Sequence, residues 1–309
     1  PVKPQYNKKW PEVPALSELD QWIAQKEAQH RLRADNEARV IWADSLHQAT
    51  PYALVYLHGF SASQEEGDPV HRNVARRFGC NLYLSRLAEH GIDTSEQLLR
   101  LSADAYWESA KEALAIGTRL GQKVILMGTS TGGTQALQLA AAYPDKVAAL
   151  ILYSPNIAIN DPNAWLLNNP WGLQIARLVK GSKYNDPEDD RPVYRQYWNK
   201  PYRLESVTAL EEMLETNGKL APDHGWYQLY SAKDQAVSED MIKRSADAGL
   251  NWTFLNVPDV PGGQLDTMGG HLFWYNSTKV WVSDDDGQSF VQSGTFPSDV
   301  NVQQVTFAD

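Results

Sequence analysis

The sequence predicts an α/β fold in which a mostly parallel sheet is covered by helices on both faces. Short apolar runs alternate with segments of helical pattern through the first half of the chain. Such alternation is typical of parallel strands joined by right-handed helical crossovers. With 309 residues, 42% of them hydrophobic, the chain is long enough to bury a large core.

The individual elements follow from local patterns. We expect a helix over 17–33, followed by strands at 39–43, 52–57, 81–84, 124–127 and 147–153. Thr94 and Gln97 have the spacing of a capping box, which predicts a helix from there to about Leu120. A run of good helix formers over 134–142 predicts a third helix that stops at Tyr143-Pro144.

The most informative motif is Gly128-Thr129-Ser130-Thr131-Gly132, which lies between a predicted strand and a predicted helix. In a sharp strand-to-helix turn, glycines on both sides of the serine remove Cβ atoms that would otherwise collide, and the serine Oγ is left exposed. Ser130 is therefore a candidate nucleophile. The alternative is a surface turn of glycine and serine without chemistry.

A second motif, His58-Gly59-Phe60, comes directly after the strand predicted at 52–57. A loop in this position supplies one backbone amide to an oxyanion hole, and the residue after the nucleophile supplies the other. We therefore expect the Phe60 and Thr131 N–H groups to form the oxyanion hole. His58 is expected to brace this loop through hydrogen bonds and not to act as a base.

These motifs, together with the segments 86–91 and 149–155, resemble the α/β-hydrolase superfamily, and within it the bacterial serine carboxylesterases. The resemblance is clearest over 50–155. It implies that a carboxylic ester is cleaved through an acyl-enzyme by a Ser-His-Asp triad, with no metal and no organic cofactor.

The acid and the base are expected later in the chain, since the order in this superfamily is Ser, Asp, His. The resemblance gives the acid role to Asp234, at the end of an apolar strand that begins at Trp226. A helix from Ser238 and another strand are expected to follow. His271 is the only histidine beyond that strand and is the candidate base; His224 is the reserve.

The chain is expected to consist of four parts, the last of which departs from the hydrolase pattern because it alternates apolar and polar residues like a strand. Residues 1–155 are expected to form the first part of the hydrolase core, 156–218 a helical lid insertion, 219–275 the second part of the core and 276–309 a β-rich tail. The insertion contains three tryptophans that either form an apolar acyl pocket over Ser130 or attach the lid to the body: Trp165, Trp171 and Trp198.

The last third of the chain supports a second interpretation. The segments 245–252 and 283–290 both have the pattern S-x-D-x-G-x-x-aromatic and resemble Asp-box β-hairpins. In such hairpins the Asp and Ser side chains bond the backbone of the turn, which is a structural role. The alternative function is therefore a catalytically inactive hydrolase-like scaffold with a C-terminal β-hairpin segment that binds a glycan or a protein.

Charge and composition limit the partners. The net charge of −10 argues against nucleic-acid binding, which needs basic surfaces. A single cysteine, Cys80, allows no intrachain disulfide and no cysteine zinc cluster. No apolar run is long enough for a membrane span. We expect a small-molecule ester as partner, and a cytoplasmic protein, or an exported one if a signal peptide was removed before Pro1. The acyl and alcohol specificity and the oligomeric state stay open.

Overall fold

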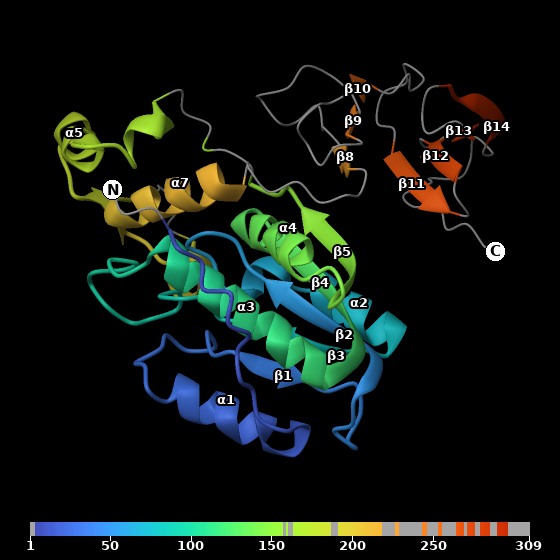
Figure 1. Ribbon diagram of the computed structural model, residues 1–309, viewed down its shortest axis with the longest axis horizontal. Coiled ribbons are helices and arrows are strands. Elements are labelled where there is room, and N and C mark those ends of the chain that lie inside the picture. The colour runs from blue at the N-terminus through green and yellow to red at the C-terminus, as the bar shows by residue number, and fades with distance from the viewer. Residues whose placement is uncertain are drawn as a thin grey trace. The chain divides into compact units, whose positions relative to one another are not determined.

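The computed structural model in Figure 1 divides into two compact units, residues 1–220 and 221–309, which we call the first and the second unit. It describes residues 4–156, 159, 163–186, 191–217, 226–228, 243–245, 253–254, 264–268, 271–275, 279–284 and 289–295. Each unit is considered by itself.

The first unit is built on a five-stranded sheet with the order β1-β3-β2-β4-β5 (Figure 1). The strands β2 to β5 are parallel, whereas β1 pairs antiparallel with β3 at one edge. The bounds are Arg39–Ile41 for β1, Thr50–Leu57 for β2, Asn81–Leu84 for β3, Gly121–Thr129 for β4 and Val147–Tyr153 for β5. This sheet confirms the predicted fold class, and all five strands lie where the sequence predicts them.

Helices cover both faces of the sheet, and the side chains of β2 show why. Alternate residues of a strand point to opposite faces. Val55 and Leu57 belong to the core cluster that contains residues of α3 and α4, whereas Tyr56 belongs to a second cluster with Ala75 of α2. The covering helices are α1 (Leu19–Glu27), α2 (Val70–Phe78), α3 (Ala103–Leu120) and α4 (Thr131–Ala142), with short 3-10 turns η1 (Leu16–Glu18) and η2 (Gln64–Gly67).

The helix predicted from Thr94 begins nine residues later. Leu98 has a φ of 58°, which an α-helix does not accept, so the expected capping box does not form. Thr94 Oγ1 instead accepts a hydrogen bond from the Glu96 N–H in a local turn. Ser102 is the actual N-cap, and its Oγ accepts from the Ala105 N–H at 3.1 Å. The prediction was wrong because a serine cap nearer the apolar run starts the helix, and the segment before it forms a loop.

The predicted insertion contains mainly helices in its described part. They are η3 (Ala164–Leu166), α5 (Gly172–Lys180), α6 (Pro192–Tyr197) and α7 (Glu205–Asn217), and β6 (Tyr184–Asn185) pairs with β7 (Tyr202–Arg203). The helix α7 packs against α3 and α4 and buries Met213 completely. The insertion is therefore anchored on α3 and α4 through its last helix.

The second unit consists of antiparallel strands in its described part. One sheet has the order β10-β9-β8 and another the order β11-β12-β13-β14. The bounds are Trp226–Gln228 for β8, Lys243–Ser245 for β9, Thr253–Phe254 for β10, Gln264–Met268 for β11, His271–Tyr275 for β12, Lys279–Ser283 for β13 and Val291–Thr295 for β14. The strand that starts at Trp226 thus pairs with β9, where a helix was expected, and not with the parallel sheet.

Among the described residues, no helix has the length and apolar character that a membrane crossing requires.

Candidate active site

Ser130 occupies a strained turn between β4 and α4. Its backbone has φ 50° and ψ −119°, a conformation that costs a non-glycine residue about 1–3 kcal/mol and persists only when the surroundings fix it. Three hydrogen bonds do so. The Ser130 N–H donates to the Tyr153 carbonyl at 2.8 Å, and the Ser130 carbonyl accepts from the N–H groups of Asn156 (3.0 Å) and Thr134 (3.2 Å). The turn therefore joins the ends of β4 and β5.

The glycines around Ser130 allow this turn to pack without clashes. A Cβ on Gly128 would lie 2.5 Å from the Gly132 carbonyl oxygen, and a Cβ on Gly132 would lie 2.0 Å from the Leu57 carbonyl oxygen. Real Cβ atoms do not approach backbone oxygens so closely. The start of α4 can thus lie directly against the end of β2, where the loop with His58 and Gly59 begins.

The orientation of the Gly59–Phe60 peptide is fixed by its carbonyl. The Gly59 oxygen accepts from His58 Nδ1 at 2.9 Å and from the Ala62 N–H at 3.2 Å. In a trans peptide the N–H points opposite to the C=O, so the Phe60 N–H is directed away from these donors. Neither the Phe60 nor the Thr131 N–H donates to an acceptor in the part of the chain that the structure describes.

Two buried histidines tie this loop to the loop after β3. The Leu87 N–H donates to His58 Nε2 at 3.0 Å, and the Ser61 N–H donates to His90 Nε2 at 3.0 Å. Because each Nε2 is an acceptor, each Nδ1 carries the hydrogen, and it donates to the carbonyl of Gly59 in one ring and to that of Ala88 in the other. Both imidazole rings are therefore neutral, and each ring nitrogen takes part in a hydrogen bond.

Burial keeps these histidines neutral. It lowers the pKa of His58 from 6.5 to about 4. Burial also lowers the pKa of His90 well below its usual value, with a smaller contribution from His58, whose ring centroid lies 4.8 Å away. Neither ring has a nitrogen available for a proton from Ser130, so His58 braces the loop, as the sequence predicts.

A carboxyl group that sequence reasoning missed lies beside the same loop. The Gly59 N–H donates to Glu66 Oε2 at 2.6 Å, and the nearby Tyr56 hydroxyl lowers the pKa of this carboxyl. Tyr56 in turn lies 2.9 Å from Thr129 Oγ1. Burial is the main cause that raises the pKa of Glu66. In the sequence Glu66 follows another glutamate in a polar turn, so nothing in the pattern distinguishes it from a solvated acidic residue.

The insertion contacts the loop through residues that the sequence did not single out. Tyr202 packs edge-on against Phe60, with ring centroids 5.2 Å apart. The fully buried Asn199 donates its N–H to the Ser61 carbonyl at 2.5 Å and accepts from the Gly91 N–H at 3.0 Å. The segment 199–202 therefore helps to hold the loop.

The three predicted pocket tryptophans lie in the insertion with different surroundings. Trp165 and Trp171 are 59% and 73% exposed, so they do not attach the insertion to the described body of the protein. Trp198 is half-buried and stacks on Tyr194, with ring centroids 4.3 Å apart. Their part in substrate binding stays a prediction.

The remaining predicted residues belong to the second unit. His271 is the first residue of β12 and pairs with Met268, whereas Asp234 and the reserve base His224 lie outside the described residues. Both Asp-box-like segments connect antiparallel neighbours, β9 with β10 and β13 with β14, but most of their turn residues also lie outside the described part. The structure thus brings the loop of Phe60 against Ser130 and Thr131, and the roles of Asp234 and His271 stay predictions.

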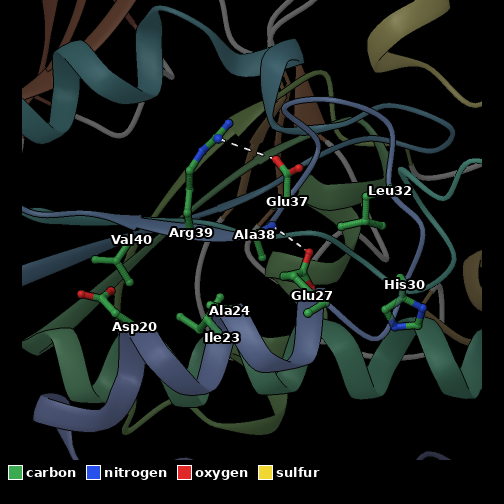
Figure 2. A pocket seen from close by; sticks show the side chains of 11 residues that line it. Asp20, Ile23, Ala24, Glu27, His30, Leu32, Glu37, Ala38, Arg39 and Val40 are labelled. Atoms are coloured by element: carbon green, nitrogen blue, oxygen red, sulfur yellow. Dashed lines mark hydrogen bonds and ion pairs between the residues drawn. The ribbon is translucent and has the colours of Figure 1, made fainter.

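A pocket of about 460 Å³ lies between α1 and β1 (Figure 2). Its most prominent polar group, the Glu27 carboxylate, is already engaged by Arg86 at 2.6 Å and by the Ala38 N–H at 2.9 Å. Its lining includes neither Ser130 nor Phe60. No group of metal-ligating side chains is found among the described residues.

Comparison with known proteins agrees with the fold. Residues 90–216 match the family model described as serine aminopeptidase, S33. No curated protein matches the sequence. Among solved structures, the chain is similar to one reported for LipS and LipT, two metagenome-derived lipolytic enzymes, at 16% identity and a TM-score of 0.51, with 62% of this chain and 73% of that chain covered.

Two further structures are similar at lower TM-scores. One is a monoacylglycerol lipase from Paleococcus ferrophilus, at 14% identity and a TM-score of 0.43, with 60% of this chain and 72% of that chain covered. The other is Est1E from Butyrivibrio proteoclasticus with bound ferulic acid, at 15% identity and a TM-score of 0.38, with 59% of this chain and 69% of that chain covered. The parallel sheet and the similarity to the structure reported for LipS and LipT show that the chain has the α/β-hydrolase fold.

Proposed function

We propose that the protein is a serine hydrolase that cleaves a carboxylic ester of a small molecule through an acyl-enzyme. The observation that carries this proposal is the backbone of Ser130, which is held in a strained conformation beside a loop with an unengaged amide. Strain of this kind at a serine is retained where it serves a function. The similarity in fold to the structure reported for two lipolytic enzymes, LipS and LipT, supports the same class of reaction.

In the proposed reaction Ser130 Oγ attacks the ester carbonyl carbon while its proton passes to a general base. The carbonyl oxygen becomes an oxyanion that accepts hydrogen bonds from the Phe60 and Thr131 N–H groups. Collapse of this intermediate breaks the bond to the alcohol oxygen, and the base returns the proton to the leaving alcohol. Water then attacks the acyl-enzyme in the same way and releases the acid.

The base and the acid in this proposal follow from the chain order Ser, Asp, His that the resemblance implies. His58 and His90 have both ring nitrogens engaged, and His271 is proposed as the base, with Asp234 fixing its tautomer. The tryptophans of the insertion are proposed to line the acyl side of the substrate.

A second candidate function keeps the hydrolase-like body without catalysis. It is favoured by the placement of both Asp-box-like segments between antiparallel strands, which is where a structural hairpin turn belongs. The second unit would then be a binding segment, and His271 would have no role in proton transfer.

Turnover of short 4-nitrophenyl esters by the wild-type protein and by Ser130→Ala separates the two candidates. The proposal expects hydrolysis that is lost in the variant while the melting temperature is kept. Hydrolysis that persists in Ser130→Ala, or a folded wild-type protein that turns over no ester, would contradict it.

A further inference from the structure

The contacts of Glu66 point to a role in the proposed active site beyond the triad and the two oxyanion amides. The loop that carries Phe60 contains one glycine, Gly59, whose N–H and C=O are both engaged. The C=O is held by His58 and Ala62, and the N–H by Glu66 Oε2 at 2.6 Å. Two consecutive peptide planes, on either side of Gly59, are therefore fixed.

Gly59 lies beside both this carboxyl and the nucleophile. The position that a Cβ on Gly59 would take lies 2.8 Å from Glu66 Oε1 and 3.1 Å from the Ser130 Cβ. The carboxyl and the serine side chain thus approach the same face of one glycine, with no room for another atom. A shift of the Gly59 backbone would consequently change the distance between the loop and the reacting serine.

The carboxyl is itself held in place from both sides. It lies in η2, whose N-cap Ser63 accepts from the Glu65 N–H, and Gly67 packs so closely that a Cβ there would lie 2.5 Å from the Tyr56 ring. The Tyr56 hydroxyl lies 2.9 Å from Oγ1 of Thr129, the residue before the nucleophile, and it also lowers the pKa of the Glu66 carboxyl. Glu66 is therefore part of a chain of interactions that runs from Thr129 through Tyr56 and Glu66 to Gly59.

We propose that Glu66 is a positioning residue of the oxyanion hole: its carboxyl holds the Gly59 amide, so that the Phe60 N–H keeps its direction toward the oxyanion that forms on Ser130. This inference rests on the proposed function. The Phe60 amide stabilises charge that exists only in the transition state, so misplacing it lowers kcat and leaves KM nearly unchanged.

The loss of kcat expected for Glu66→Ala has an upper bound. Complete loss of one oxyanion donor costs about 10²–10³ in kcat. Without Glu66 the Gly59 carbonyl is still held by His58 and Ala62, so Glu66→Ala should cost less, roughly 10- to 100-fold in kcat. Glu66→Gln keeps an amide oxygen that accepts from the Gly59 N–H, so it should recover most of this loss.

The test measures two properties of the full chain in wild type, Glu66→Ala, Glu66→Gln and the matched control Glu65→Ala, a neighbouring carboxylate in the same turn. The first is kcat and KM for a short 4-nitrophenyl ester. The second is amide hydrogen exchange of the peptide that covers 57–63. We expect Glu66→Ala alone to lower kcat without raising KM and to speed exchange in this peptide, with the melting temperature recorded for all four proteins.

The outcomes separate this proposal from the proposed function. If the wild type turns over ester and Glu66→Ala keeps its kcat, or raises only KM, the positioning role is refuted while the hydrolase stands. If the wild type turns over no ester, the hydrolase proposal fails, and exchange decides about Glu66: unchanged exchange in 57–63 refutes the positioning role and faster exchange supports it.

Discussion

The two neutral histidines, His58 and His90, that brace the loop of Gly59 and Phe60 should make the free energy of unfolding fall at mildly acid pH. His58 Nε2 accepts from the Leu87 N–H, so protonation at Nε2 would place two hydrogens against each other and break the contact. Burial lowers the pKa of His58 from 6.5 to about 4 in the folded protein. The unfolded chain therefore binds a proton more readily than the folded one between these two pH values.

The direction and the size of the change in the free energy of unfolding follow from the difference between the two pKa values. The stabilisation is fully present above pH 6.5 and is lost as the pH falls toward about 4. Between pH 7.5 and pH 5 the linkage relation gives a loss of about 2 kcal/mol in the free energy of unfolding from His58 alone. His90, whose pKa is also lowered, adds to the loss in the same direction.

Urea unfolding at pH 7.5 and pH 5 measures this effect. His58→Gln cannot titrate in this range, so its free energy of unfolding should fall by about 2 kcal/mol less than that of the wild type over the same interval. His30→Gln, which removes an exposed histidine, is the control and should follow the wild type. If His58→Gln loses as much stability between the two pH values as the wild type, the neutral, buried state of His58 is refuted.

Three other predictions concern the turn, the insertion and the base. Gly132→Ala should abolish ester turnover, because its Cβ would lie 2.0 Å from a backbone oxygen of β2. Gly79 has open space around it, so Gly79→Ala should keep activity and lower the free energy of unfolding by only about 1 kcal/mol through its left-handed backbone. Ester turnover and thermal melting check both variants. Trp171→Ala should change the preference among acyl chain lengths by about 1–3 kcal/mol per methylene and barely change the melting temperature, since Trp171 is 73% exposed; equal loss on all chain lengths would exclude it from the acyl pocket. Asp234→Asn should lower kcat about 10⁴-fold, and His271→Ala by a comparable amount, with folding intact; full activity in His271→Ala would instead support the scaffold interpretation.

The sequence was sufficient for the sheet and the serine turn because both depend on local patterns. The apolar runs at β2 to β5 are bounded by turn residues, and the glycines beside Ser130 have one obvious use, which the contacts of Gly128 and Gly132 confirm. The start of α3 was missed because Thr94 and Ser102 both have the chemistry of an N-cap, and the φ of Leu98 depends on tertiary packing.

The residues that hold the loop of Gly59 and Phe60 could not be predicted because they meet only in three dimensions. Glu66 resembles any acidic residue in a polar turn until its contact with Gly59 is known. Asn199 and Tyr202 come from an insertion whose sequence shows aromatic enrichment but not which side chains reach the loop. Long-range contacts of this kind leave no periodicity or spacing in the sequence.

Covalent labelling tests the central claim most directly. A fluorophosphonate probe reacts with a serine only when its Oγ is activated and the oxyanion hole accepts the phosphoryl oxygen. Mass spectrometry of the labelled, digested protein should find one modified site, Ser130, and no modification in Ser130→Ala. Labelling at another residue, or no labelling of a folded wild-type protein, would contradict the assignment of Ser130 as the nucleophile.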